Sequence, residues 1–149
     1  MNKEIISVIG SGTMGNGIAH VFSTCNIIRK VILVDVDNSI LERAKLIIEK
    51  NLDRQVKKNI LLAKDATYAL GKIMFTTNFD EIKESGLIIE AIKEDIDIKK
   101  DVFNKISDLV GENTILASNT SSISINELSK ASKNPKNVIG MHFMNPVPV

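Results

Sequence analysis

Six short hydrophobic runs recur along the chain, separated by longer stretches in which hydrophobic and polar residues are mixed. Each run is continuous rather than alternating, which is typical of strands that are covered on both faces, as in a parallel sheet. We expect these strands at residues 5–9, 31–34, 73–75, 87–89, 114–117 and 138–141.

Between the runs, hydrophobic residues recur at the three- and four-residue spacing of amphipathic helices. We expect helices over residues 14–23, 39–58 and 95–110, and a further one that begins near Ile125 after a cap at Ser124. The third helix carries Ile96, Lys99, Val102, Phe103, Ile106 and Val110 at helical spacing. Strands that alternate with helices predict a doubly wound α/β fold of the Rossmann type, with a mostly parallel sheet and right-handed crossovers.

Composition favours one domain that binds a small molecule. The 149 residues, 44% of them hydrophobic, suffice for a single core, so we assign residues 1–149 to one domain. A formal net charge of +1 gives no field that would attract nucleic acid or an anionic membrane. The lone Cys25 cannot form an internal disulfide, and no Cys and His cluster has the spacing of a metal site. Without a signal peptide or membrane span, we expect a soluble, cytoplasmic protein.

The sequence GSGTMG at residues 10–15 follows the first expected strand and opens the first helix, which is the context of a dinucleotide site. Gly10 would allow the tight turn, Gly12 the approach of a pyrophosphate, and Gly15 the close packing of helix on strand. The phosphates would lie on free N–H groups at the positive end of the helix. The alternative is a glycine-rich turn that only makes a sharp corner.

Acidic residues close the second and fourth strands. Asp35 could accept hydrogen bonds from the adenosine ribose and would repel a 2′-phosphate, which favours NAD over NADP. It could instead cap the next helix, although Asp37 could do that equally well. We expect Glu90 to face the cofactor crevice, because ligands of such folds lie outside the carboxyl ends of the strands. The alternative is a strand end exposed to solvent.

Two polar segments follow the fifth and sixth strands, namely residues 118–122 and the segment that begins at His142. Both should leave the same edge of the sheet, so hydroxyls, amides and an imidazole can converge near the nicotinamide end of a dinucleotide. Taken singly, Ser, Thr and Asn clusters are typical of turns and caps, and a lone histidine is often structural. Together they favour a reaction site.

Four motifs, at residues 8–19, 88–91, 118–122 and 142–148, resemble the 3-hydroxyacyl-CoA dehydrogenase family, which includes bacterial 3-hydroxybutyryl-CoA dehydrogenases. The resemblance covers essentially the whole chain. It implies an NAD-dependent, reversible oxidation of the 3-hydroxyl of an acyl-CoA thioester to a 3-keto group, in fatty acid or butanoate metabolism.

The resemblance also implies roles for individual residues. His142 matches the catalytic histidine that takes the hydroxyl proton, a task suited to imidazole. Ser121 matches the serine that hydrogen-bonds the reacting oxygen. Lys58 matches a lysine that touches the coenzyme A phosphates, but it could equally be the solvated end of a helix. With the glycine motif, the expected cofactor contacts are Gly10, Gly12, Thr13, Met14, Gly15, Asp35, Glu90, Ser121 and Asn145.

The chain departs from the family pattern in three places. In the turn before the second strand, where the family usually has a glycine, this chain has Cys25 and Asn26 and an apparent two-residue insertion. Asp97 stands where many members have a basic residue, seven positions after Glu90, so one cofactor contact is in doubt. The chain ends at Val149, before a glutamate that orients the imidazole and before the helical domain that completes the substrate pocket and the dimer.

From this last departure we expect the chain to bind NAD but to catalyse poorly by itself, because loss of the residue that orients a catalytic base costs orders of magnitude in rate. A helical C-terminal domain or a second copy is the expected partner. Two other functions remain open: a non-catalytic NAD(H)-binding or regulatory module, and a dehydrogenase of free 3-hydroxy acids or sugar acids.

Overall fold

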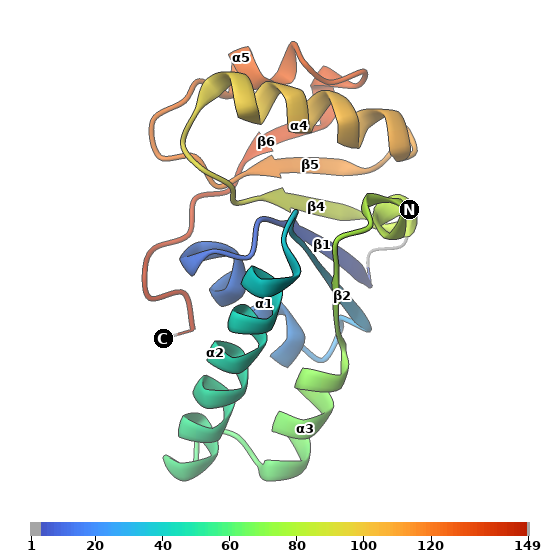
Figure 1. Cartoon of the computed structure of the whole chain (residues 1–149). Coiled ribbons are helices and arrows are strands. Elements are labelled where there is room, and N and C mark those ends of the chain that lie inside the picture. Colours follow the sequence, from blue (N-terminus) through green and yellow to red (C-terminus); the bar gives the residue numbers. More distant parts are fainter. Residues whose placement is uncertain (1–3, 149) are drawn as a thin grey trace.

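A computed structural model describes residues 4–148, in which all six expected strands form one sheet (Figure 1). The strands are β1 Ile5–Ile9, β2 Lys30–Val34, β3 Ile73–Thr76, β4 Leu87–Glu90, β5 Ile115–Ser118 and β6 Val138–Gly140. Their order is β3-β2-β1-β4-β5-β6, and every pair of neighbours is parallel. The predicted Rossmann-type fold is confirmed, and the sheet is wholly rather than mostly parallel.

The expected helices are present, and one helix that the sequence did not predict is added. The predicted helices are α1 Thr13–Thr24, α2 Asn38–Lys57, α4 Ile96–Leu109 and α5 Ile125–Ser129. The additional helix is α3 Ala63–Gly71, of which only Ala66 and Ala69 are buried. Two short 3-10 segments, Phe79–Glu84 and Pro135–Asn137, complete the chain.

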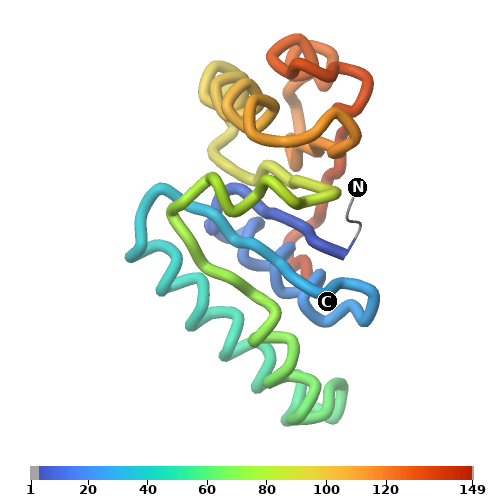
Figure 2. Tube along the Cα trace, turned by 90° about the vertical axis from the view of Figure 1, so that its right-hand side faces the viewer, coloured from blue at the N-terminus to red at the C-terminus, as the bar shows by residue number. Residues whose placement is uncertain are grey.

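The helices form two layers, with α1, α2 and α3 on one face of the sheet and α4 and α5 on the other (Figures 1 and 2). Side chains of β1 alternate between the layers, as a pleated strand requires. Ile6 and Val8 join the core under α1 and α2, whereas Ile5 and Ile9 join the core under α4. The first core is the larger of the two and supports the glycine turn.

The insertion before β2 leaves the strand pairing intact. Ile28 is buried and anchors the turn, while Ile27 points outward. The Nζ atom of Lys72 donates a 2.9 Å hydrogen bond to the carbonyl of Cys25 and so closes the end of α1. The register of β1 on β2 runs without interruption from Ile5 opposite Lys30 to Ile9 opposite Val34. The extra residues are therefore absorbed in the turn.

His20 lies on α1 and is 1% exposed, facing α2. Its Nε2 atom is 3.1 Å from Oε1 of Gln55, whereas its Nδ1 atom is buried without a partner among the described residues. Burial lowers the pKa of this imidazole, and the hydrogen bond with Gln55 opposes the shift only in part. The folded protein therefore holds His20 in its neutral form.

We predict that His20 destabilises the fold as the pH falls. Because its pKa is lower in the folded state, the unfolded chain takes up the proton first once the pH drops below 6.5. His20→Gln should remove this contribution, so the free energy of unfolding should fall less steeply for the variant than for the wild type between about pH 8 and pH 5. Urea unfolding at several pH values measures both slopes, and equal slopes would contradict the prediction.

Candidate functional site

The glycine turn between β1 and α1 is built so that two of its residues cannot carry a side chain. Gly10 has a φ of +93°, and a Cβ atom there would lie 2.8 Å from the carbonyl oxygen of Ala91. A Cβ atom on Gly15 would lie only 1.7 Å from the carbonyl oxygen of Gly10. The first glycine thus permits the turn, and the other permits α1 to pack directly on it.

Gly12 differs from both, because a Cβ atom there would meet no atom within 4 Å. It is the N-cap of α1, and both Gly12 and Thr13 are exposed. The first N–H groups of a helix have no acceptor within the helix, and no acidic residue lies in this first turn. The turn therefore presents free donors at the positive end of the helix dipole, which fits the phosphates of a nucleotide.

Asp35 follows β2 and faces the glycine turn. Its Oδ2 atom accepts hydrogen bonds of 2.7 Å from both the backbone N–H and the hydroxyl of Ser11. The alternative role of capping α2 belongs to Asp37, which accepts a 2.7 Å bond from the N–H of Ser39. Asp35 thus stands where a ribose beside the phosphates could reach it.

A hollow of about 320 Å³ opens at the carboxyl ends of the strands, within the size range of small-molecule sites. It brings together four predicted residues from three separate segments, namely Met14, Ser121, His142 and Asn145. Its other lining residues are Ala91, Ile92, Glu94, Asn119, Phe143 and Met144. The predicted convergence of the two polar segments is therefore confirmed.

The parallel pairing of β5 with β6 and a hydrogen bond to the side chain of Asn119 explain this convergence. The register aligns Ser118 of β5 with Gly140 of β6, so the segments that follow leave the same edge. Beyond the strands, Oδ1 of Asn119 accepts a 2.8 Å hydrogen bond from the N–H of Phe143. Asn119 thereby fixes the backbone directly after His142. Sequence reasoning did not single out Asn119, although its place after a buried strand was a possible signal.

Glu90 does not face the crevice, contrary to the sequence prediction. The residue is 1% exposed, and its carboxylate points inward. Its Oε1 atom lies 2.6 Å from Nζ of Lys99 and accepts a 2.7 Å bond from the N–H of Ile92, while Oε2 accepts a 2.6 Å bond from the hydroxyl of Ser118. A buried carboxylate requires such partners. The basic partner of Glu90 is Lys99, whereas Asp97, at the position where a basic residue was expected, is exposed.

Glu94, which sequence reasoning missed, lines the hollow instead. One of its oxygens, Oε2, lies 3.3 Å from Nζ of Lys99, and the other accepts hydrogen bonds from Thr120, Ser121 and Ser122. Burial alone would raise the pKa of this carboxyl, but the hydrogen bond from Thr120 and the charge of Lys99 outweigh it and lower the pKa to about 2. Glu94 is therefore an anion at neutral pH.

Lys58 is not brought to the hollow. It is an exposed residue just after α2, a helix of 20 residues and therefore about 30 Å long, which begins close to the glycine turn and runs away from it. A coenzyme A contact of Lys58 therefore stays a prediction.

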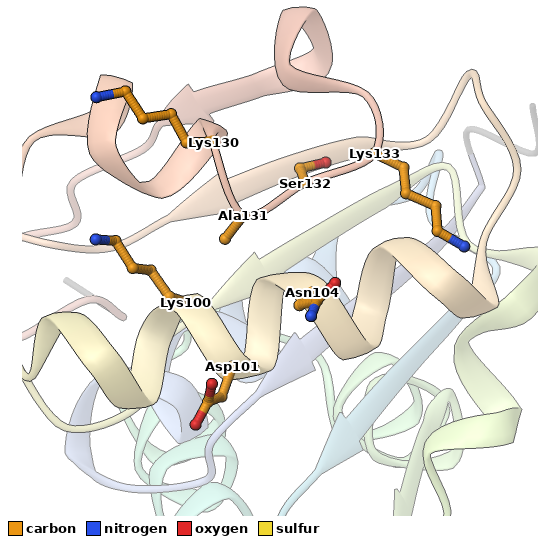
Figure 3. Close-up of a pocket in the computed structure, with 7 residues that line it drawn as sticks. All are labelled: Lys100, Asp101, Asn104, Lys130, Ala131, Ser132 and Lys133. Atoms are coloured by element: carbon orange, nitrogen blue, oxygen red, sulfur yellow. The ribbon is translucent and has the colours of Figure 1, made fainter.

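A second hollow of about 360 Å³ lies between α4 and residues 130–133, which follow α5, and carries three lysines (Figure 3). Their charges are already paired on the protein surface. Lys100 and Lys130 contact Glu127, and Lys133 lies 2.6 Å from Asp108. Two of these lysines share the single carboxylate of Glu127, and Asp101 also lines the hollow. None of the sequence-predicted site residues lines it, so the crevice at the carboxyl edge is the better candidate.

Among residues 4–148, no group of three His, Cys, Asp or Glu side chains is arranged to hold a metal ion. In the same range, no helix has the length and hydrophobicity needed to cross a membrane.

Comparison with known proteins places this geometry in a family. Residues 5–149 match the family model described as 3-hydroxyacyl-CoA dehydrogenase, NAD binding domain. The chain is 43% identical to a 3-hydroxybutyryl-CoA dehydrogenase of Clostridioides difficile, over 97% of the chain and 50% of that relative. It is 36% identical to a 3-hydroxyadipyl-CoA dehydrogenase of Escherichia coli K12, over 100% of the chain and 31% of the relative.

A solved structure agrees with the sequence comparison. The (S)-3-hydroxybutyryl-CoA dehydrogenase of Ralstonia eutropha superposes with a TM-score of 0.94 at 39% identity, covering 99% of this chain and 51% of that one. The chain thus spans about half the length of several relatives that it matches.

Gly15 and Gly71 lie in different surroundings, so an added methyl group should have opposite effects on stability at the two positions. Gly15→Ala forces a Cβ atom against a backbone oxygen, so we expect a loss of about 3 kcal/mol in the free energy of unfolding, the upper end of the usual cost of overpacking. Gly71→Ala, at the open end of α3, meets no atom within 4 Å and should be neutral or stabilising by up to about 1 kcal/mol. Denaturant unfolding of both variants tests this, and a Gly15→Ala protein as stable as the wild type would refute the packing argument.

Proposed function

Because the chain belongs to the family of 3-hydroxyacyl-CoA dehydrogenase NAD-binding domains, we propose that it serves the oxidation of a 3-hydroxyacyl-CoA, such as 3-hydroxybutyryl-CoA, to the 3-ketoacyl-CoA. The observation that carries this proposal is the presence of Ser121 and His142 in one hollow at the edge that also bears the glycine turn. A purely NAD(H)-binding module would need neither side chain. The proposed setting is fatty acid or butanoate metabolism.

The residues of the glycine turn fit the cofactor of this family, NAD. Its phosphates would be held at Gly12 and the start of α1, where the backbone is open and no acidic side chain opposes them. Asp35 would hold the adenosine ribose, and its charge would disfavour a 2′-phosphate. Met14 and Asn145 line the hollow on the side of the reaction. When bound, NAD supplies the acceptor for the hydride that leaves C3 of the substrate.

The protein's own residues handle the substrate oxygen. We assign His142 as the base that takes the proton of the 3-hydroxyl, a task for which imidazole is the usual side chain. The Ser121 hydroxyl would donate a hydrogen bond to the same oxygen and stabilise the negative charge that develops there. Both residues are exposed in the described part of the chain, so a substrate can reach them.

The substrate pocket requires more than the described residues, in our proposal. Relatives of about twice this length match the chain, which fits a further domain as the element that completes the site. That this domain is helical, or that a second copy takes part, stays a prediction. The coenzyme A contact of Lys58 belongs to this larger assembly and stays a prediction, as does the cytoplasmic location.

Titration with NADH tests the cofactor site. The chain should bind NADH with micromolar affinity, seen as enhanced cofactor fluorescence. Gly12→Asp would place a carboxylate at the start of α1 and should weaken binding at least about tenfold, or about 1.4 kcal/mol. Gly111→Asp is the matched control, because Gly111 is also exposed with open space around it and lies in another loop. Equal binding by both variants would exclude the glycine turn as the phosphate site.

Turnover tests the role of His142. Fused to the remaining half of the Clostridioides difficile relative, the chain should reduce acetoacetyl-CoA with NADH, whereas the chain alone should do so poorly. His142→Asn should lower kcat of the fusion by about 10²- to 10⁴-fold and leave NADH affinity within about twofold. His20→Gln, at the only other histidine of the chain, should retain activity. A His142→Asn fusion with full kcat would overturn the assignment.

A further inference from the structure

The loop at residues 118–122 carries four hydroxyl groups, and three of them donate hydrogen bonds to carboxylates. Ser118 donates to Glu90, while Thr120 and Ser122 donate to Oε1 of Glu94. The hydroxyl of Ser121 has no hydrogen-bond partner among residues 4–148, and it lines the same hollow as His142. The loop therefore presents one free hydroxyl out of four.

The same oxygen of Glu94 also holds the main chain around Ser121. It accepts hydrogen bonds from the N–H of Ser121 at 3.2 Å and from the N–H of Ser122 at 3.3 Å. These two N–H groups belong to the peptide units directly before and after the Cα atom of Ser121. Fixing both units sets the direction in which the Ser121 side chain leaves the backbone.

Lys99 holds Glu94 in place. Its Nζ atom lies between two carboxylates, 2.6 Å from Oε1 of Glu90 and 3.3 Å from Oε2 of Glu94. Lys99 and Glu90 are each 1% exposed, so the ammonium group cannot leave the pair for solvent without leaving a buried charge uncompensated. Both carboxylates bind the loop, and charge-assisted hydrogen bonds of this kind are stronger than neutral ones.

Glu94 is poorly suited to proton transfer. A general base should have a pKa near the operating pH, whereas the pKa of Glu94 is lowered to about 2 by the loop hydroxyls and Lys99 despite the opposing effect of burial. Its Oε1 atom is also surrounded by donors of the loop. Its contacts therefore indicate a geometric role.

We propose that Glu94, held by its ion pair with Lys99, is a positioning residue that fixes the loop at residues 118–122. Of the hydroxyl groups in this loop, only that of Ser121 is then free to form a hydrogen bond with the reacting oxygen of the substrate. The task of Ser121 in this inference rests on the proposed function. The fixing of the loop rests only on the contacts described above, so the two can be tested separately.

Backbone amide exchange, followed by NMR on the cofactor-free chain, tests the fixing of the loop. Glu94→Gln should speed exchange at the N–H groups of Ser121 and Ser122 at least about tenfold, because a neutral amide loses the charge-assisted bonds. Glu127→Gln is the matched control, since Glu127 is also a carboxylate paired with lysines, but on α5. It should leave both amides unchanged.

Unchanged protection of Ser121 and Ser122 in Glu94→Gln would overturn the proposal. If that variant fails to fold, Ser122→Ala removes one exposed donor to Glu94 and should still speed exchange at the N–H of Ser121. No change there would overturn the proposal equally.

A double-mutant cycle on kcat tests whether Glu94 acts through Ser121. In the active fusion, Glu94→Gln should lower kcat at least about tenfold when Ser121 is present but less than about twofold in a Ser121→Ala background. Equal losses in the two backgrounds would show that Glu94 acts independently of Ser121 and would overturn the positioning role. Failure of the proposed function has a different signature, namely a wild-type protein that neither binds NADH nor turns over while the amide protection remains.

Discussion

The buried ion pair of Glu90 and Lys99 joins the end of β4 to α4 where the crevice begins. Glu90 closes a strand that is covered on both faces, so its carboxylate has no access to water and must find partners within the protein. Desolvation costs several kcal/mol for each ion, and only close contacts with further hydrogen bonds offset it. The pair therefore fixes the relative positions of β4, α4 and β5, on which the arrangement of the crevice depends.

The two ends of the crevice differ in the polar groups that they leave free, although both lie at the same edge of the sheet. At the glycine turn, bare backbone and the positive end of α1 are left open to an anion. At the other end, the carboxylates of Glu90 and Glu94 occupy most of the polar groups of the β5 loop, so that few remain available to a substrate. Both ends lie together only because all six strands run in one direction and finish at one edge.

Hydrophobic periodicity predicted all six strands and the longer helices, because strands buried on both faces produce continuous runs that polar segments do not. It missed α3, whose buried residues Ala66 and Ala69 are too small and too few to form a visible apolar stripe. The common edge of parallel strands also predicted that Ser121 and His142 would converge. The direction of Glu90 was predicted wrongly, although one signal was present: Lys99 falls on the inward face of α4, where a lysine needs an anion.

The contact between Asp35 and Ser11 bears on how tightly the proposed site would bind the ribose of the cofactor. Three hydrogen bonds, two from Ser11 and one from the N–H of Val36, already hold the Asp35 carboxylate in a single orientation. Immobilising a mobile side chain at a binding site opposes association by about 0.5–1.5 kcal/mol. The folded protein has already lost this side-chain entropy, so in the proposed cofactor site the ribose would meet an acceptor that is already oriented.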